Sequence, residues 1–147
     1  MRSAFIASFM AGVAVCVAPP VMASHTPNFL QRGEAEYAQG RYAVAVKDLE
    51  RAIIVDPMNV EAYSALARTY EAVGRKDRAE KYFGIALEID PTNAGALEGD
   101  GLLALKSGHR DTAEEHLSRL RNLCAECPET RRLAEAITAT GKDATQK

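Results

Sequence analysis

Histidine and cysteine, the side chains that most often hold metals or act as nucleophiles, are scarce in this sequence, with three of each among 147 residues. The sequence contains no G-x-S-x-G nucleophile motif, no glycine-rich phosphate loop and no H-E-x-x-H zinc motif. Its few histidines are too scattered to pair with a nucleophile. The sequence therefore predicts no catalytic site, no metal site and no cofactor, and it favours a protein that is not an enzyme.

A strong excess of charge of either sign is also missing. The 18 basic and 20 acidic residues give a formal net charge of −2, which becomes −3 if residues 1–23 are removed, because that segment holds Arg2 and no acidic residue. Proteins that bind polyanions without sequence preference usually carry a clear positive excess. We therefore expect no nucleic acid partner.

Long hydrophobic runs are absent as well. The apolar run Ala4–Ala18 is shorter than the about 18 residues that a membrane-spanning helix needs, and two prolines follow it. Arg2 before the run and short residues up to Ala23 after it give the layout of a secretory signal. We therefore expect residues 1–23 to be a cleaved signal peptide, with no membrane span afterwards. The protein would be exported, to the periplasm or otherwise secreted.

What the sequence does contain is a repeat of 34 residues. Glycine recurs at positions 40, 74 and 108, and alanine recurs at 45, 79 and 113. Four more columns keep the period: Gly33, Ala67 and Gly101; Leu49, Phe83 and Leu117; Ala52, Ala86 and Leu120; Pro57, Pro91 and Ala125. A period of this length indicates units that bury their apolar faces by stacking on one another.

One period predicts a pair of antiparallel helices. In residues 60–93, apolar residues follow helical spacing, stop at Gly74, and resume in a second stripe that ends before Pro91. Glycine adopts the left-handed conformation that ends helices, and the residue before a proline resists the helical conformation. Asn93 or Thr92 can cap the next helix.

These columns resemble the tetratricopeptide repeat (TPR) family, with repeats at 26–59, 60–93 and 94–127. The middle repeat matches the family at the positions expected to form the repeat core: Tyr63, Leu66, Ala67, Tyr70, Ala79, Phe83, Ala86 and Pro91. The resemblance implies an all-α fold, a right-handed superhelix of antiparallel helix pairs with about seven helices. The expected helices are 28–39, 43–55, 60–72, 77–89, 94–106, 111–123 and 129–139.

The outer repeats depart from the family pattern at polar positions. Arg32 and Asp100 stand where leucine is usual, and polar residues are expected in an end repeat because one side faces water. Residues 128–141 resemble the capping helix that closes such arrays, with Gly141 at its end. Residues 142–147 are expected to be a disordered tail.

The segment GALEGDG, residues 95–101, is rich in glycine. Leucines flank it at helical spacing, so its glycines are expected to permit close contact between helices rather than to bind phosphate. Glu98 and Asp100 are expected to be solvated rather than an acid–base dyad.

In the proteins that this sequence resembles, the first helix of each repeat lines a groove that holds a peptide or a partner's helix. The resemblance therefore implies a protein-interaction scaffold, which we place in the bacterial envelope, with a protein or peptide ligand and with self-association as a further option. The expected groove residues are Leu30, Glu34, Tyr37, Arg68, Glu71, Glu98, Leu102, Leu105 and Lys106. Family members that grip the acidic tail of cytosolic chaperones use Lys and Asn where this sequence has Leu30, Glu34 and Ala65, so that clamp is absent.

Cys124 and Cys127 form a C-x-x-C motif and are the cysteines that remain without residues 1–23. Pro128 stands where covalent haem attachment needs a histidine, and a zinc site lacks further ligands. Two interpretations stay open. We favour a disulfide that fixes the angle of the closing helix, since an export compartment lets disulfides persist. The alternative is a thiol–disulfide redox protein or redox-gated adaptor, in which Cys127, at a helix N-terminus, is the attacking thiol and Cys124 the resolving one.

Overall fold

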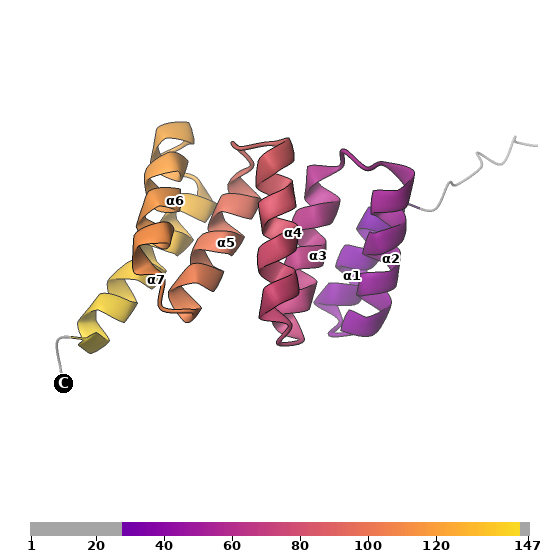
Figure 1. Ribbon diagram of the computed structural model, residues 1–147, viewed down its shortest axis with the longest axis horizontal. Helices are drawn as coiled ribbons and strands as arrows, with labels where there is room; N and C mark the ends of the chain where they lie inside the picture. The colour runs from indigo at the N-terminus through magenta and orange to yellow at the C-terminus, as the bar shows by residue number, and fades with distance from the viewer. Residues whose placement is uncertain (1–27, 145–147) are drawn as a thin grey trace, which may run out of the picture.

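The computed structural model describes the backbone of residues 28–144. Within that range it has no strand and seven helices, which follow one another in Figure 1: α1 (Phe29–Ala38), α2 (Tyr42–Val55), α3 (Val60–Ala72), α4 (Lys76–Ile89), α5 (Ala94–Lys106), α6 (Arg110–Leu123) and α7 (Pro128–Ala144). The predicted all-α fold is confirmed, and α1 to α6 lie within one residue of their expected bounds. The predicted signal peptide, residues 1–23, and the last part of the predicted tail, residues 145–147, lie outside the described residues.

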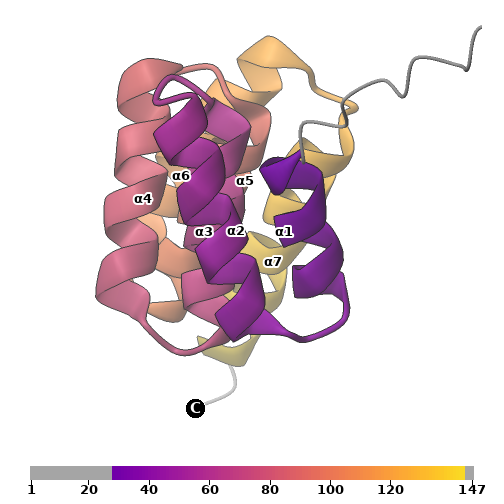
Figure 2. The same ribbon diagram turned by 90° about the vertical axis from the view of Figure 1, so that its right-hand side faces the viewer.

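The helices form an array of two rows. α1, α3, α5 and α7 contact one another in sequence and make the first row, whereas α2, α4 and α6 make the second row. Within residues 28–144 the second-row helices contact first-row helices but not one another. Figure 2, which looks along the array from the α1–α2 end, shows α1 and α7 toward one side and α4 toward the other. The first row is therefore continuous, and it determines where a groove can form.

A glycine in the left-handed conformation ends each of the helices α1, α3 and α5, as the 34-residue column predicts. The φ angles are 72°, 77° and 85° at Gly40, Gly74 and Gly108. Gly141 does not adopt this conformation, and a glycine inside a helix costs only about 1 kcal/mol relative to alanine. α7 therefore continues through Gly141 to Ala144, so residues 142–144, which were expected to belong to the disordered tail, are part of the helix.

Asparagine side chains cap three of the four first-row helices, α1, α3 and α5. Asn59 Oδ1 accepts a hydrogen bond from Ala62 N at 2.9 Å, and Asn93 Oδ1 accepts one from Ala96 N at 2.8 Å. Each bond satisfies an N–H group that has no partner within its helix. Asn93, rather than Thr92, is therefore the N-cap of α5.

The middle repeat supplies the centre of the hydrophobic core. Tyr70 stacks on Tyr82 with ring centroids 5.5 Å apart. Of the residues expected to form the repeat core, these are buried or partly buried: Tyr63, Leu66, Ala67, Tyr70, Ala79, Phe83 and Ala86. The expectation was wrong for Pro91, which is exposed and follows the end of α4. Proline at this position stops the helix rather than filling the core.

Two glycines of α5 allow neighbouring elements to approach its backbone. A Cβ on Gly99 would lie 2.4 Å from ring atoms of Phe83, and a Cβ on Gly101 would lie 2.8 Å from Leu133 Cδ2. Neither distance is compatible with a real side chain, so these positions need glycine unless the neighbour moves. The expectation that the glycines of residues 95–101 serve close helix contact agrees with the packing of Gly99 and Gly101 but not with that of Gly95, near which only the Asn93 side chain lies.

Two positions that recur with the 34-residue period are filled differently in each repeat. They hold Arg32 and Asp48 in the first repeat, Leu66 and Tyr82 in the second, and Asp100 and His116 in the third. Arg32 Nε donates to Asp48 Oδ2 at 2.6 Å, and Asp100 Oδ2 lies 2.9 Å from Nε2 of the buried His116. Asp100 was expected to be solvated, which is wrong, because the imidazole of His116 binds it. The outer repeats thus place a polar pair where the middle repeat has an apolar one.

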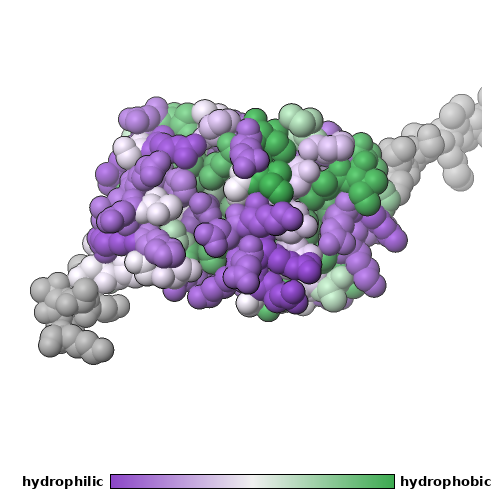
Figure 3. All heavy atoms as spheres, in the orientation of Figure 1, coloured by the Kyte–Doolittle hydropathy of each residue, from purple (hydrophilic) through white to green (hydrophobic). Residues whose placement is uncertain are grey.

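Figure 3, in the orientation of Figure 1, shows hydrophobic side chains gathered toward the α1–α2 end of this face. The largest exposed apolar residues of that end lie at the end of α2 and in the turn after it: Ile54, Val55 and Met58. They are separate from the first-row surface that is described below.

We predict that Arg32→Leu lowers the melting temperature by on the order of 5 °C, because it leaves the buried Asp48 carboxylate without the guanidinium that binds it. Adding Asp48→Tyr, which recreates the Leu–Tyr combination of the middle repeat, should restore most of that loss. Thermal unfolding followed by circular dichroism measures both. Arg68→Leu is the control, since its exposed ion pair with Glu34 contributes little. A double variant no more stable than Arg32→Leu alone would contradict the prediction.

The same pair predicts how stability depends on pH. Hydrogen bonds from Arg32 hold the pKa of Asp48 below its ordinary value, so the folded protein keeps the carboxylate ionised where the unfolded chain, with a pKa of about 3.9, takes up a proton. The contribution of Asp48 is therefore fully present above about pH 4 and is lost as the pH falls through the lowered pKa. Urea unfolding at pH 7 and pH 3 should show a smaller acid-induced loss in Arg32→Leu/Asp48→Tyr than in the wild type. Equal losses would show that the pair does not carry this dependence.

Candidate functional site

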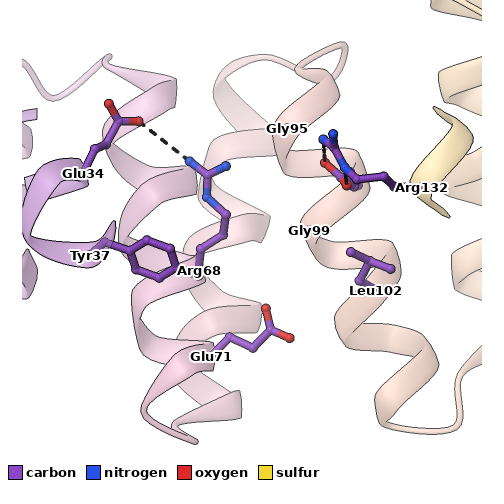
Figure 4. A pocket seen from close by; sticks show the side chains of 9 residues that line it. Glu34, Tyr37, Arg68, Glu71, Gly95, Gly99, Leu102 and Arg132 are labelled. Carbon is purple, nitrogen blue, oxygen red and sulfur yellow. Dashed lines mark hydrogen bonds and ion pairs between the residues drawn. The ribbon is translucent and has the colours of Figure 1, made fainter. Parts of the chain in front are cut away.

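The surface of the first row of helices has an open hollow of about 440 Å³. All four first-row helices contribute to its wall, α1 and α3 from one side and α5 and α7 from the other (Figure 4). The lining residues are Glu34, Tyr37, Arg68, Glu71, Gly95, Glu98, Gly99, Leu102 and Arg132.

Helical spacing and the repeat period together bring these residues to one surface. Glu34 and Tyr37 lie three residues apart on α1, and Arg68 and Glu71 lie three apart on α3, so each pair shares a helix face. Arg68 also follows Glu34 by one full repeat. Equivalent positions of successive repeats therefore stand side by side along the groove.

A second hollow of about 300 Å³ lies between α5 and α7. Its wall is almost entirely aliphatic, with Lys106 and Thr140 as the polar residues; the lining residues are Leu102, Leu105, Lys106, Ala136, Ala139 and Thr140. Leu102 lines both hollows, so the two adjoin. We call the first the polar hollow, the second the aliphatic hollow, and the two together the groove.

The structure brings eight of the nine expected groove residues together. Six of them line the polar hollow: Glu34, Tyr37, Arg68, Glu71, Glu98 and Leu102. Leu105 and Lys106 line the aliphatic hollow. Leu30 does not belong to the groove, because it lines a separate hollow at the N-terminal end, with Phe29 and Val55 among its neighbours. Among the described residues, no helix pair precedes α1 to continue the groove at that end.

The contribution of α7 to the groove was missed. Arg132 lines the polar hollow, and Ala136 and Ala139 line the aliphatic one. A signal was present in the sequence, since these three residues follow Glu98, Leu102 and Leu105 by 34 positions. α7 thus occupies the place of a fourth first-row helix as well as closing the array.

Three ion pairs connect neighbouring first-row helices across the groove. Glu34 Oε1 and Arg68 Nη2 lie 3.9 Å apart, and Glu71 Oε1 and Lys106 Nζ lie 2.6 Å apart. Arg132 binds Glu98 through two hydrogen bonds, with Nη2–Oε2 at 2.7 Å. The pairs hold α1 to α3, α3 to α5, and α5 to α7, and Figure 4 shows the first and last of them as dashed lines.

A second expectation from the sequence, that Glu98 is solvated, was wrong. The Glu98 side chain is buried beside Arg132. The hydrogen bonds with Glu98 raise the pKa of Arg132 above its ordinary value, so the guanidinium stays charged across the physiological range. The spacing of Glu98 and Asp100 showed their positions on α5 but not that α7 and α6 bring partners to them.

Cys124 and Cys127 lie in the turn between α6 and α7, with their Sγ atoms 1.98 Å apart. Thr130 Oγ1 donates a hydrogen bond to the carbonyl oxygen of Cys124 at 2.7 Å, which joins the first turn of α7 to this segment. Arg132 lies only five residues after Cys127. The geometry of the cysteine turn therefore bears directly on how α7 meets the groove.

Residues 28–144 contain no group of three or more His, Cys, Asp or Glu side chains arranged to hold a metal ion. No helix in this part of the chain has both the length and the apolar character needed to cross a membrane.

Comparison with known proteins connects the fold to a family. Residues 30–94 match the family model described as tetratricopeptide repeat. The chain is 32% identical over 97 residues to the TPR repeat-containing thioredoxin TTL4 of Arabidopsis thaliana, and this match covers 66% of the chain but only 14% of that relative.

Solved structures show the same fold at lower sequence identity. The Sgt2 TPR domain from Aspergillus fumigatus is 21% identical with a TM-score of 0.71, covering 81% of this chain and 80% of that one. The second TPR domain of human RPAP3, solved in complex with an HSP70 peptide, is 20% identical with a TM-score of 0.66, covering 76% and 92%. The Yersinia enterocolitica secretion chaperone SycD, in complex with a peptide of the translocator YopD, is 19% identical with a TM-score of 0.67, covering 80% and 90%.

The family match spans the first two helix pairs, and the likeness to solved TPR domains extends over most of the remaining array. The helix order, the left-handed glycines and the first-row groove agree with both findings. Residues 30–94 are therefore similar to the tetratricopeptide repeat family, and the described helices have the fold of solved TPR domains.

Proposed function

We propose that this protein is a non-enzymatic scaffold of the bacterial envelope that binds a peptide or a helix of a protein partner in the groove. The observation that carries the proposal is the pair of adjoining hollows along the first row, lined by residues from all four helices of that row. Solvent-exposed concave surfaces with a few convergent polar groups are the usual place for a ligand.

Two of the solved relatives support a peptide ligand, because they were determined with peptides bound, the human RPAP3 domain with an HSP70 peptide and SycD with a YopD peptide. The location in the envelope rests on residues 1–23, whose layout favours export. Self-association stays a prediction, for which the exposed apolar residues at the α1–α2 end offer a surface.

We expect the variant Tyr37→Ala/Arg68→Ala to bind peptide at least tenfold more weakly, because both side chains line the polar hollow and neither is part of the buried core. A library of random dodecapeptides supplies the probe, and fluorescence polarisation measures the Kd of a selected peptide.

Val44→Ala/Lys47→Ala on α2 is the matched control, since it removes one apolar and one cationic side chain from an exposed surface away from the groove. Both variants should keep the wild-type circular dichroism spectrum. A selected peptide that binds Tyr37→Ala/Arg68→Ala as tightly as the wild type would contradict the groove as the binding site.

The alternative function, a thiol–disulfide redox protein or redox-gated adaptor, is favoured by one observation: Cys124 and Cys127 adjoin the helix that completes the groove. We expect instead a structural disulfide, with a reduction potential below about −300 mV. Thiol trapping and mass spectrometry against a glutathione series measures the potential. The redox function would be favoured by a value of about −120 to −200 mV together with a mixed disulfide captured by Cys127 in Cys124→Ser.

A further inference from the structure

We propose that the ligand of the groove is an acidic peptide segment that places an aliphatic side chain in the aliphatic hollow and a nearby carboxylate on Lys106. This inference rests on the proposed function, and it specifies the chemistry of the partner. Two observations support it. The wall of the second hollow is mostly aliphatic, and in the two tight ion pairs of the groove the cation is more exposed than the carboxylate.

The aliphatic hollow fits an aliphatic side chain because two leucines and two alanines form most of its wall. Ala136 and Ala139 lie where the preceding repeat has Leu102 and Leu105, so the small side chains of α7 leave space that larger ones would fill. Transfer of apolar surface from water into such a hollow is favourable by roughly 25 cal/mol per Å². No carboxylate lines this hollow among the described residues, whereas the ammonium group of Lys106 does.

The charge that a ligand meets in the groove is positive, although the lining contains as many carboxylates as cations. In the Glu71–Lys106 pair, the side chain of Lys106 is 61% exposed and that of Glu71 is 19% exposed. In the Glu98–Arg132 pair, Arg132 is 52% exposed and Glu98 is 11% exposed. Arg132 Nη2 also lies 3.2 Å from Oε1 of Glu129, which does not line the groove. Both tight pairs therefore cover the carboxylate and present the cation.

The third pair does not reverse this balance. Glu34 and Arg68 are exposed to similar extents, 49% and 45%, and their closest oxygen and nitrogen lie 3.9 Å apart, beyond hydrogen-bond distance. Arg68 can therefore turn toward a ligand carboxylate without losing a strong bond. Three exposed cations face one exposed carboxylate, which favours an acidic ligand.

The Glu71–Lys106 pair connects the two hollows. Glu71 lines the polar hollow and Lys106 lines the aliphatic one. A peptide whose aliphatic side chain occupies the aliphatic hollow brings its neighbouring residue to this boundary. A carboxylate there competes with Glu71 for the same ammonium group, so the pair acts as an exchangeable contact. The cations Arg68, Lys106 and Arg132 stand at other positions than Leu30, Glu34 and Ala65, where the chaperone-tail clamp would have its Lys and Asn residues.

The aliphatic part of the proposal is tested by filling the hollow. Selection of random dodecapeptides on the protein should enrich peptides that combine Asp or Glu with Leu, Ile, Val or Met. Ala136→Leu/Ala139→Leu should weaken the binding of such a peptide at least tenfold, because the added side chains occupy the hollow. Thr138→Leu is the control, since it adds a leucine to an exposed position of α7 that does not line the hollow. Unchanged binding in Ala136→Leu/Ala139→Leu would overturn this part.

The electrostatic part is tested by two variants of the same ion pair, for which the proposal predicts opposite effects. Lys106→Gln should weaken binding of the selected peptide several-fold because the ligand carboxylate loses its partner. Glu71→Gln should strengthen binding because the competing carboxylate is gone. If the pair is merely structural, the selected peptide should bind more weakly to both variants. If the ligand is cationic, Lys106→Gln should strengthen binding and Glu71→Gln should weaken it. Either result would overturn the proposal, as would enrichment of Lys and Arg in the selected peptides.

The outcomes separate this inference from the proposed function. If selected peptides lose affinity in Tyr37→Ala/Arg68→Ala but not in Ala136→Leu/Ala139→Leu, the groove binds peptides without the proposed anchor. If their affinity is unchanged in both double variants, the groove itself is not the binding site.

Discussion

The structure depends on one constraint: each helix pair leaves an apolar face that only the next helix in the first row can cover. Phe83 packs against α5 at Gly99, and Leu133 of α7 packs against α5 at Gly101. Both large side chains are fully buried, and both contacts need glycine on the opposing helix. Because no second-row helix contacts another within the described array, the covering contacts of the first row join one repeat to the next.

α7 meets this constraint at the end of the array, and its position has a second consequence. The face of α7 that carries Leu133 and Ile137 covers the third repeat, while Arg132, Ala136 and Ala139 line the groove. Stability and ligand binding therefore share a single helix at this end. A change that shifts α7 alters both stability and ligand binding. The turn at Cys124 and Cys127, which precedes α7, therefore affects both properties although it lies far from the middle repeat.

The period and the turn residues made most of the fold predictable. Glycine and asparagine have local conformational preferences that do not depend on the partner helix, so the ends of α1 to α6 were predicted to within one residue. The groove residues of the complete repeats followed for the same reason, since helical spacing and a 34-residue period determine their face. Leu30 was assigned to the groove because the family positions were carried to the first repeat, where no earlier helix pair among the described residues continues the groove.

The polar residues of α5 were less predictable because their environment depends on helices far away in the sequence. Glu98 is bound by Arg132, and Asp100 is bound by His116, at sequence separations of 34 and 16. From the sequence alone, a carboxylate in such a helix is expected to be solvated, because its partner side chain comes from another helix. For α7, the 34-residue offset was available, but residues 128–141 were interpreted only as the helix that caps the array.

Two positions recur with the 34-residue period but hold a different pair of side chains in each repeat. These unequal pairs favour the native pairing of helices in an otherwise repetitive array. The positions hold Arg32 with Asp48, Leu66 with Tyr82, and Asp100 with His116. If α5 packed on α2 in place of α6, two carboxylates would face each other at a buried position. If α3 packed there, Leu66 would leave the buried Asp48 without the hydrogen bonds of Arg32. Both alternatives leave a buried carboxylate poorly compensated, which is costly. Similar repeats can exchange partners during folding, so the unequal pairs oppose an exchange that the shared apolar columns would otherwise permit.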